Sequence, residues 1–179
     1  MRDTQAILDF WFNDVGQDRW WVRSDATDAE IAGRFRETWE RLRGRPVEDF
    51  LGCPRDALAA ILLFDQFPRN MFRHQAEAFA TDPIALAIAE GALDRDFEKD
   101  LTKAERSFLY MPFMHSEMPA DQERSVALFE QLGWPEPLKF ARLHRDMIAK
   151  LGRFPARNAA LGRVDRPEEA EAIEASKAW

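Results

Sequence analysis

The chain has 179 residues, with 25 basic and 32 acidic side chains and a net charge of −7. A chain of this length can bury one sizeable core unaided, so we expect a single domain over residues 1–179. The one cysteine, Cys53, excludes an internal disulfide and a four-cysteine zinc site, and favours a reducing compartment. The longest apolar run, residues 57–64, is far shorter than the roughly 20 residues that cross a bilayer. We expect no membrane span, and the acidic start of the chain favours a cytoplasmic protein.

The composition favours helices. Ala, Leu, Glu and Arg account for 78 residues, whereas Val, Ile and Thr account for 17. The first group loses little rotamer freedom in a helix, and β-branched residues are typical of strands. Only eight glycines are present, so few hairpin turns are expected. The composition predicts an all-α fold, an α-α array of about eight helices joined by corners that contain proline.

The first two helices are predicted from their caps and apolar spacing. Asp3 or Thr4 can cap the first helix. Its apolar stripe has the helical i, i+3, i+4 spacing and contains Ile7, Leu8, Trp11 and Phe12. A second helix begins at Thr27 and stops before Gly44 and Pro46.

The third helix is expected at the centre of the fold. Pro54 suits its first turn, and residues 57–64 are apolar on nearly every side. It must end before Pro68, because the residue before a proline disfavours the helical conformation. Thr81 can cap a fourth helix that runs to about Leu93.

The second half of the chain contains the remaining predicted helices. Thr102 begins a fifth helix with a capping box, and Pro112 kinks or breaks it. A sixth helix covers 119–132, and a seventh begins at Pro137. The chain is then irregular until a terminal helix over 168–177.

Four polar side chains fall on the apolar faces of four different predicted helices. They are Asp65, His115, Gln122 and His144. Each one alone is ordinarily a hydrogen-bonded core residue. Together they allow a second interpretation, because buried polar groups need partners and find them by converging in one place. The sequence leaves both interpretations open.

A short string is nearly duplicated in the chain. Phe-Pro-Arg-Asn at 67–70 recurs as Phe-Pro-Ala-Arg-Asn at 154–158. Proline can hold the first turn of a short helix, and the free N–H groups of that turn attract an anion. An arginine in the same turn is unfavourable unless an anion offsets its charge. Asp65 or Glu117 could supply that negative charge as an internal ion pair. Alternatively, a carboxylate or phosphate ligand could be held by the planar guanidinium groups.

Charge is distributed unevenly along the chain. Residues 139–166 carry a net charge of +6, whereas residues 1–138 carry −10. The acidic body could simply neutralise the basic segment. If the arginines of this segment point into a cleft instead, they would concentrate anionic ligands there. The acidic net charge argues against nucleic acid, although Trp20 and Trp21 could stack on bases.

No cofactor or metal is predicted. The chain has no paired-histidine helix motif, no glycine-rich phosphate loop and no dinucleotide fingerprint. A serine hydrolase is disfavoured because no nucleophile elbow is present.

Several strings resemble those of the bacterial domain-of-unknown-function family 924. They are residues 7–12, 61–70, 79–82, 108–112, 115–117, 121–125, 152–155 and 161–163. The resemblance covers about residues 6–165, and it implies an all-helical fold similar to tetratricopeptide-type superhelices, without an established reaction. The family pattern has a histidine where this chain has Ala156. If that histidine is a catalytic base elsewhere in the family, activity in this chain is altered or lost.

Two classes of function follow from these observations. The first is a cleft that binds, and could transform, a small molecule with a carboxylate or phosphate. Histidines would exchange protons there, because their charge changes near neutral pH. The catalytic candidates are Asp65, His115, Glu117 and His144. The ligand-binding candidates are Arg69, Asn70, Gln122, Arg153, Arg157, Asn158 and Arg163.

The second class is an interaction module. Helical arrays commonly bind a peptide or a partner helix in a concave groove. A homodimer through exposed tryptophans can accompany either class. The candidate residues for that contact are Trp20, Trp21 and Trp179.

Overall fold

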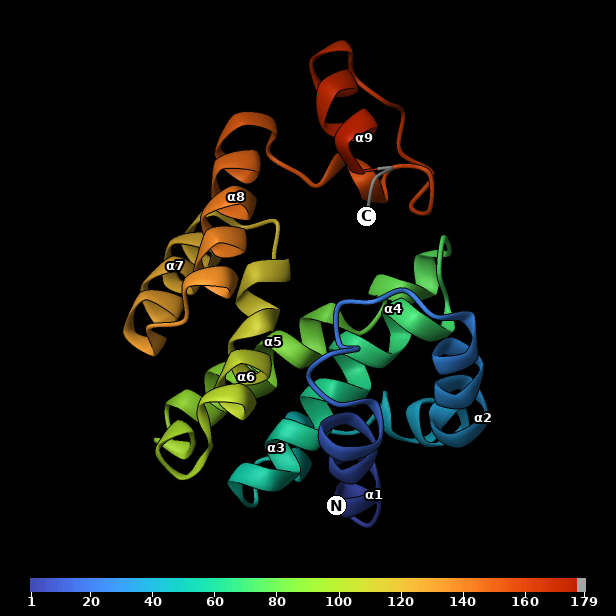
Figure 1. Ribbon diagram of the computed structural model, residues 1–179, viewed down its shortest axis with the longest axis vertical. Helices are drawn as coiled ribbons and strands as arrows, with labels where there is room; N and C mark the ends of the chain where they lie inside the picture. The colour runs from blue at the N-terminus through green and yellow to red at the C-terminus, as the bar shows by residue number, and fades with distance from the viewer. Residues whose placement is uncertain (177–179) are drawn as a thin grey trace. The chain divides into compact units, whose positions relative to one another are not determined.

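The computed structural model describes residues 1–176, which contain helices α1 to α9 and no strand (Figure 1). The predicted all-α fold is therefore confirmed. No described helix is both long enough and apolar enough to pass through a bilayer. The tetratricopeptide-like superhelix stays a prediction.

The described residues divide into two compact units. The N-terminal unit comprises Met1–Arg73 and Glu77–Pro112. The C-terminal unit comprises His74–Ala76 and the described residues from Phe113 onward. The single domain over residues 1–179 stays a prediction.

The N-terminal unit is built around α3. Its helices are α1 (Thr4–Asp9), α2 (Asp25–Leu42), α3 (Pro54–Ile61), α4 (Phe67–Met71), α5 (Asp82–Leu93) and most of α6 (Lys103–His115). Residues 57–61 of α3 are completely buried, and α3 packs against α1 and α5. The prediction of a central buried helix is confirmed.

Caps set the beginnings of two of these helices. α2 begins at Asp25, two residues before the predicted start, because the Ser24 Oγ accepts the Thr27 N–H at 3.2 Å. At α6, the predicted capping box forms. The Thr102 N–H donates to Glu105 Oε2 at 2.8 Å, and the Glu105 N–H donates to Thr102 Oγ1 at 3.3 Å. α6 then continues through Pro112 to His115, so the proline does not break it.

The prediction that the third helix ends before Pro68 is wrong. A π-helical turn, Leu62–Gln66, follows α3 directly, and α4 continues through Pro68. Proline cannot donate to the Phe64 carbonyl four residues earlier, but the Thr81 hydroxyl donates to that oxygen at 2.6 Å. A partner from another segment thus satisfies the carbonyl that the proline leaves unbonded, which allows the helix to continue.

A second π-helical turn, Phe10–Val15, follows α1 in the same way. Its Phe10 ring lies 6.0 Å from the ring of Phe67, in an edge-to-face arrangement. Phe67 is itself completely buried. The Phe10–Val15 turn therefore packs an aromatic side chain against α4 in the core of this unit.

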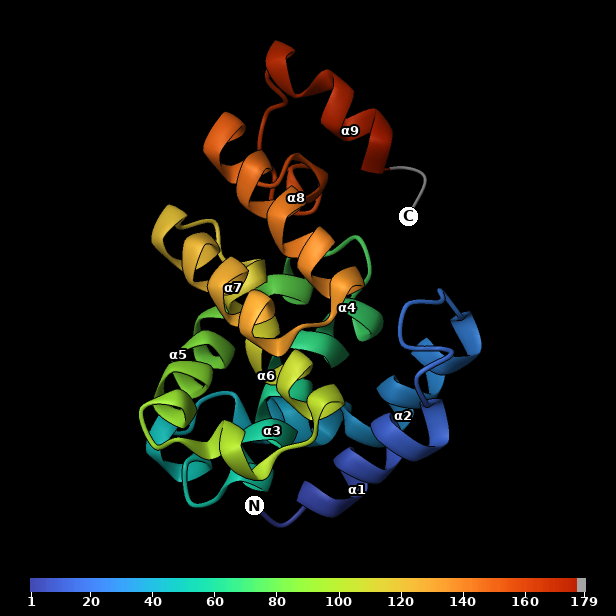
Figure 2. The same ribbon diagram turned by 60° about the vertical axis from the view of Figure 1, so that its left-hand side comes forward.

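The C-terminal unit contains α7 (Pro119–Leu132), α8 (Pro135–Leu151) and α9 (Ala170–Ser176). α7 and α8 lie side by side (Figure 2). α8 begins at Pro135 rather than at Pro137, because Trp134 is extended and leaves Pro135 in the first turn. Residues 152–166 are irregular apart from one short 3-10 turn, as predicted. The predicted terminal helix starts two residues late, and its last residue lies outside the described residues.

Candidate functional site

The sequence-predicted site residues fall in both units. Asp65, Arg69 and Asn70 belong to the N-terminal unit. The others belong to the C-terminal unit and are His115, Glu117, Gln122, His144, Arg153, Arg157, Asn158 and Arg163.

Arg69 is bound by internal carboxylates. Its Nη1 and Nη2 donate to the two carboxylate oxygens of Asp82 at 2.8 and 3.0 Å. Nη1 also lies 3.2 Å from Oδ1 of the fully buried Asp65. Burial lowers the pKa of Arg69, but the charges of Asp65 and Asp82 outweigh it and hold that pKa above its usual range. This ion pair is the structural alternative that the sequence left open.

Asp82 was not among the predicted site residues. It belongs to the 79–82 string, which was part of the family resemblance only. Asn70, which was predicted, bonds to its neighbours: Nδ2 donates to the Gln66 carbonyl at 3.0 Å, and Oδ1 accepts from Arg73 at 3.0 Å. Both residues thus support the turn around Pro68.

Glu117 joins three segments of the C-terminal unit. It lies in the link between α6 and α7, and its carboxylate accepts the Phe154 N–H at 2.8 Å. The two Nη atoms of Arg163 donate to the same carboxylate, each at 2.8 Å. Burial raises the pKa of Glu117, but these hydrogen bonds and the positive charges of Arg163 and Arg157 outweigh it and lower that pKa.

Glu169 organises the rest of this region. It is fully buried, and its carboxylate accepts from Arg153 Nε at 2.6 Å and Nη2 at 2.9 Å. Asn158 Nδ2 and the Arg166 N–H also donate to it, at 2.9 and 3.0 Å. The hydrogen bonds from Arg153, opposed by burial, lower the pKa of Glu169 to about 2. Glu169 was not among the predicted site residues, because the sequence placed it only in a terminal helix over 168–177.

Arg157 is positioned by a carbonyl and a ring. Its Nη2 donates to the His115 carbonyl at 2.8 Å, and its guanidinium carbon lies 4.7 Å from the centre of the Phe154 ring. The His144 ring meets the same phenyl ring at 5.2 Å. The side chain of Arg157 is half-buried.

His144 has a defined tautomer when its ring is neutral. Its Nδ1 lies 2.8 Å from the Phe140 carbonyl, which can only accept a hydrogen bond. The proton is therefore assigned to Nδ1, and the basic lone pair to Nε2.

Gln122 fixes the end of α6. Its buried Nε2 donates to the carbonyls of Met114 and Ser116, at 2.8 and 2.6 Å. These are carbonyls that a helix leaves unbonded at its C-terminal end. The Oε1 atom of Gln122 is buried without a hydrogen-bond partner in the structure. Gln122 therefore holds the segment that carries His115.

We call the residues joined by these contacts the C-terminal polar cluster. Its members are His115, Glu117, His144, Arg153, Phe154, Arg157, Asn158, Arg163, Asp165, Arg166 and Glu169. The charged members of this set are four arginines and three carboxylates. Within residues 1–176, no three His, Cys, Asp or Glu side chains are grouped so that they could hold a metal ion.

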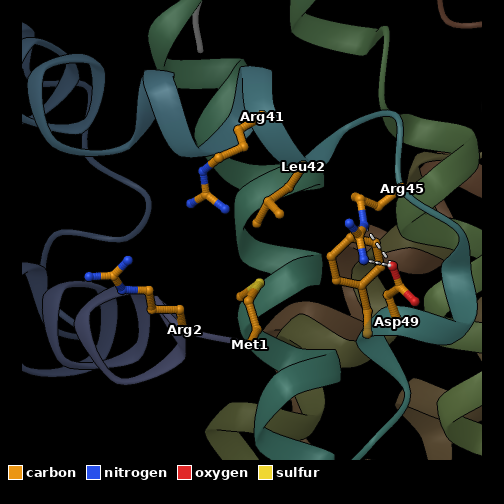
Figure 3. A pocket seen from close by; sticks show the side chains of 7 residues that line it. Met1, Arg2, Arg41, Leu42, Arg45 and Asp49 are labelled. Carbon is orange, nitrogen blue, oxygen red and sulfur yellow. Dashed lines mark hydrogen bonds and ion pairs between the residues drawn. The ribbon is translucent and has the colours of Figure 1, made fainter.

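The N-terminal unit contains a small hollow of about 240 Å³ (Figure 3). It is lined by Met1, Arg2, Arg41, Leu42, Arg45, Asp49 and Phe50. Arg41 donates to Asp3 at 2.7 Å, and Arg45 donates to Asp49 at 2.7 Å. The hollow includes none of the sequence-predicted site residues, and two of its three arginines have internal carboxylate partners.

Comparison with known proteins identifies the family. The model of a bacterial protein family of unknown function, DUF924, matches residues 7–177. A solved structure of a protein of unknown function from Agrobacterium tumefaciens is 38% identical, with a TM-score of 0.89, and the match covers 96% of this chain and 97% of that one. No curated protein matches the chain. The resemblance found in the sequence is thereby confirmed, and the chain belongs to the DUF924 family of bacterial proteins.

Proposed function

We propose that the C-terminal polar cluster binds a small anionic molecule that carries a carboxylate or a phosphate. The observation that carries the proposal is the position of Arg157, whose guanidinium donates to the His115 carbonyl and lies against the Phe154 ring, which also contacts His144. Because a planar guanidinium can bind either anion with two parallel hydrogen bonds, Arg157 is the residue assigned to receive it.

The position of Arg157 supports this assignment. The Phe154 ring and the His115 carbonyl, which hold the guanidinium, are both uncharged. Both contacts restrict the orientation of the guanidinium. A binding group that is fixed in advance loses less conformational entropy when the ligand arrives.

The other three predicted arginines are assigned a structural role instead. Arg69, Arg153 and Arg163 each donate two hydrogen bonds to one internal carboxylate. A ligand would have to displace that carboxylate and leave it unpaired, which is unfavourable for a buried charge.

His144 provides a means of proton exchange at the same site. Its ring packs against Phe154, which also contacts Arg157, and its Nε2 is the basic nitrogen of the neutral ring. We expect the affinity for phosphate to rise when this ring gains a proton, since the added positive charge attracts the anion.

Calorimetric titration of the full chain with inorganic phosphate and, separately, with malonate tests the proposal at low ionic strength. We expect saturable binding of one of these probes. Arg157→Gln should weaken it about tenfold or more, which corresponds to about 1.4 kcal/mol, and Arg157→Lys should weaken it less. The matched control is Arg142→Gln, because Arg142 is an exposed arginine of α8 that pairs with Glu130.

Circular dichroism verifies that each variant is folded. A crystal grown in phosphate should place the oxyanion against Arg157. Equal affinity in the Arg157→Gln and Arg142→Gln variants would refute the proposal. The proposal would also be refuted if neither probe bound at a concentration of about 10 mM, which would mean a binding free energy weaker than about −3 kcal/mol.

A further inference from the structure

The hollow of the N-terminal unit has three arginines and one carboxylate in its lining (Figure 3). Arg2 precedes α1, Arg41 belongs to the last turn of α2, and Arg45 follows that helix. In Figure 3 the guanidinium groups of Arg41 and Arg45 lie on opposite sides of Leu42. Arginines from separate parts of the chain thus border one hollow.

The carboxylate partners of two of these arginines leave hydrogen-bond donors unused. Arg41 Nη2 donates to Asp3 at 2.7 Å, and Arg45 Nε donates to Asp49 at 2.7 Å. Neither Nη1 atom has a hydrogen-bond partner among residues 1–176. The side chains of Arg41 and Arg45 are 51% and 59% exposed, so water screens both pairs and each contributes little to stability. A ligand can therefore bind both arginines without displacing a buried carboxylate.

Arg2 supplies a guanidinium that no internal carboxylate neutralises. Within the part of the chain that the structure describes, its side chain makes no hydrogen bond or ion pair. In this it differs from Arg69, which donates to both carboxylate oxygens of Asp82. A free guanidinium can donate two parallel hydrogen bonds to a carboxylate or a phosphate. Arg2 is therefore the arginine of this hollow that is most available to an anion.

The size and the apolar lining of the hollow limit the kind of ligand. Pockets for drug-sized molecules have volumes of roughly 300–1,000 Å³. The hollow, at about 240 Å³, is smaller than these. Part of its lining is apolar, because Phe50 is buried and Leu42 is half-buried. A ligand that matches both features has one anionic group on a small apolar body.

We infer that the hollow binds a small amphipathic anion, in which a single carboxylate or phosphate is attached to one ring or a short hydrocarbon. The anionic group would bind Arg2 and Arg41, and the apolar part would lie against Leu42 and Phe50. This site is separate from the C-terminal polar cluster, because all of its lining residues belong to the N-terminal unit.

Benzoate and phenyl phosphate are the probes, because each joins one anionic group to one ring and the pair distinguishes a carboxylate from a phosphate. Each is titrated into the isotope-labelled full chain at low ionic strength, and amide signals are followed by NMR. We expect saturable shifts of the signals of residues 41–45 and 49–50 with at least one probe. Arg2→Gln should weaken this binding about tenfold. Because the substitution removes no internal ion pair, the lost affinity would not come from a disrupted fold.

The controls separate charge, ring and site. Arg36→Gln should leave the affinity unchanged, since Arg36 is an exposed arginine of α2 that pairs with Glu40 and does not line the hollow. Benzylamine, which carries the opposite charge on a similar ring, should not bind. Acetate should bind several-fold more weakly than benzoate, because it has no ring to bury. Arg157→Gln should leave the shifts at the hollow unchanged, and Arg2→Gln should leave the affinity for inorganic phosphate unchanged.

Three results would overturn the inference. The first is that neither probe shifts the signals of residues 41–50 at a concentration of about 10 mM. The second is equal affinity in Arg2→Gln and Arg36→Gln. The third is binding of benzylamine as tight as that of benzoate. Shifts confined to residues 154–165 would place the probe in the C-terminal polar cluster, which would refute this site and leave the proposed function standing.

Discussion

The backbone N–H of Phe154 donates to the carboxylate of Glu117 across a sequence separation of 37 residues. The same carboxylate binds both Nη atoms of Arg163. One side chain therefore satisfies a backbone donor and pairs with a charge from two different parts of the irregular segment that follows α8. Removing the carboxylate would leave both groups with weaker partners at once.

Glu117→Gln should lower the free energy of unfolding by about 1–2 kcal/mol. The amide keeps the size of the side chain but loses the charge. The expected loss of stability is small because the side chains of Arg163 and Glu117 are 30% and 23% exposed, so water screens their attraction. Urea denaturation measures the change. Glu130→Gln, which breaks the exposed pair with Arg142, should change stability by less than about 0.5 kcal/mol; equal losses in the two variants would contradict the assigned role.

Thr81→Val should lower the free energy of unfolding by about 2 kcal/mol or more. The buried hydroxyl donates to the Phe64 carbonyl at 2.6 Å and accepts the Trp39 indole N–H at 3.2 Å. Valine has a similar shape but leaves both groups unsatisfied, and Pro68 cannot replace the donor. Thermal denaturation followed by circular dichroism would show the loss. Thr38→Val, at a half-buried position of α2, is the control; similar stability of the two variants would mean that the Phe64 carbonyl needs no donor.

Arg69→Lys should destabilise the fold by about 1–3 kcal/mol and leave phosphate affinity unchanged. Lysine keeps the positive charge beside Asp65 but cannot form the two parallel bonds to Asp82. Arg55→Lys is a suitable comparison, since Arg55 is 50% exposed and makes one long contact with Glu105 at 3.6 Å. A loss of phosphate binding without a loss of stability would instead place Arg69 in a ligand site.

Glu169 should make the fold sensitive to acid. Its pKa is about 2 in the folded protein, against an ordinary value of 4.5. Because folding lowers this pKa, the stabilisation is complete above about pH 4.5 and is lost as the pH falls toward 2. Urea midpoints measured across this window should fall less steeply for Glu169→Gln than for the unaltered chain. Glu171→Gln, at an exposed position, should follow the unaltered chain; identical slopes for all three proteins would exclude this role for Glu169.

Much of the fold could be predicted from local signals. The Thr102 capping box, the central position of α3 and the end of α2 before Gly44 each depend on a few neighbouring residues, and each is confirmed. The helix through Pro68 could not be predicted in this way. Its continuation depends on a hydroxyl 17 residues away at Thr81, and no pattern near the proline reveals that donor.

The predicted site residues were recognised as polar groups in apolar surroundings, but the sequence could not pair them. It offered Asp65 or Glu117 as an internal counterion, and the structure shows both in ion pairs, with Arg69 and Arg163. It missed Glu169, because burial of a carboxylate near the end of the chain depends on how residues 153–166 fold around it. Trp179, expected at a dimer contact, lies outside the described residues.

The two π-helical turns should affect how the sequences of relatives align with this chain. A π-helical turn holds one residue more than the α-helical turn that it replaces, so it can lose a residue and leave the helix continuous. Alignments of relatives should therefore tolerate single-residue gaps at Phe10–Val15 and Leu62–Gln66. The same gap inside α7 or α8 would rotate every later side chain by about 100° and displace the residues that face the core.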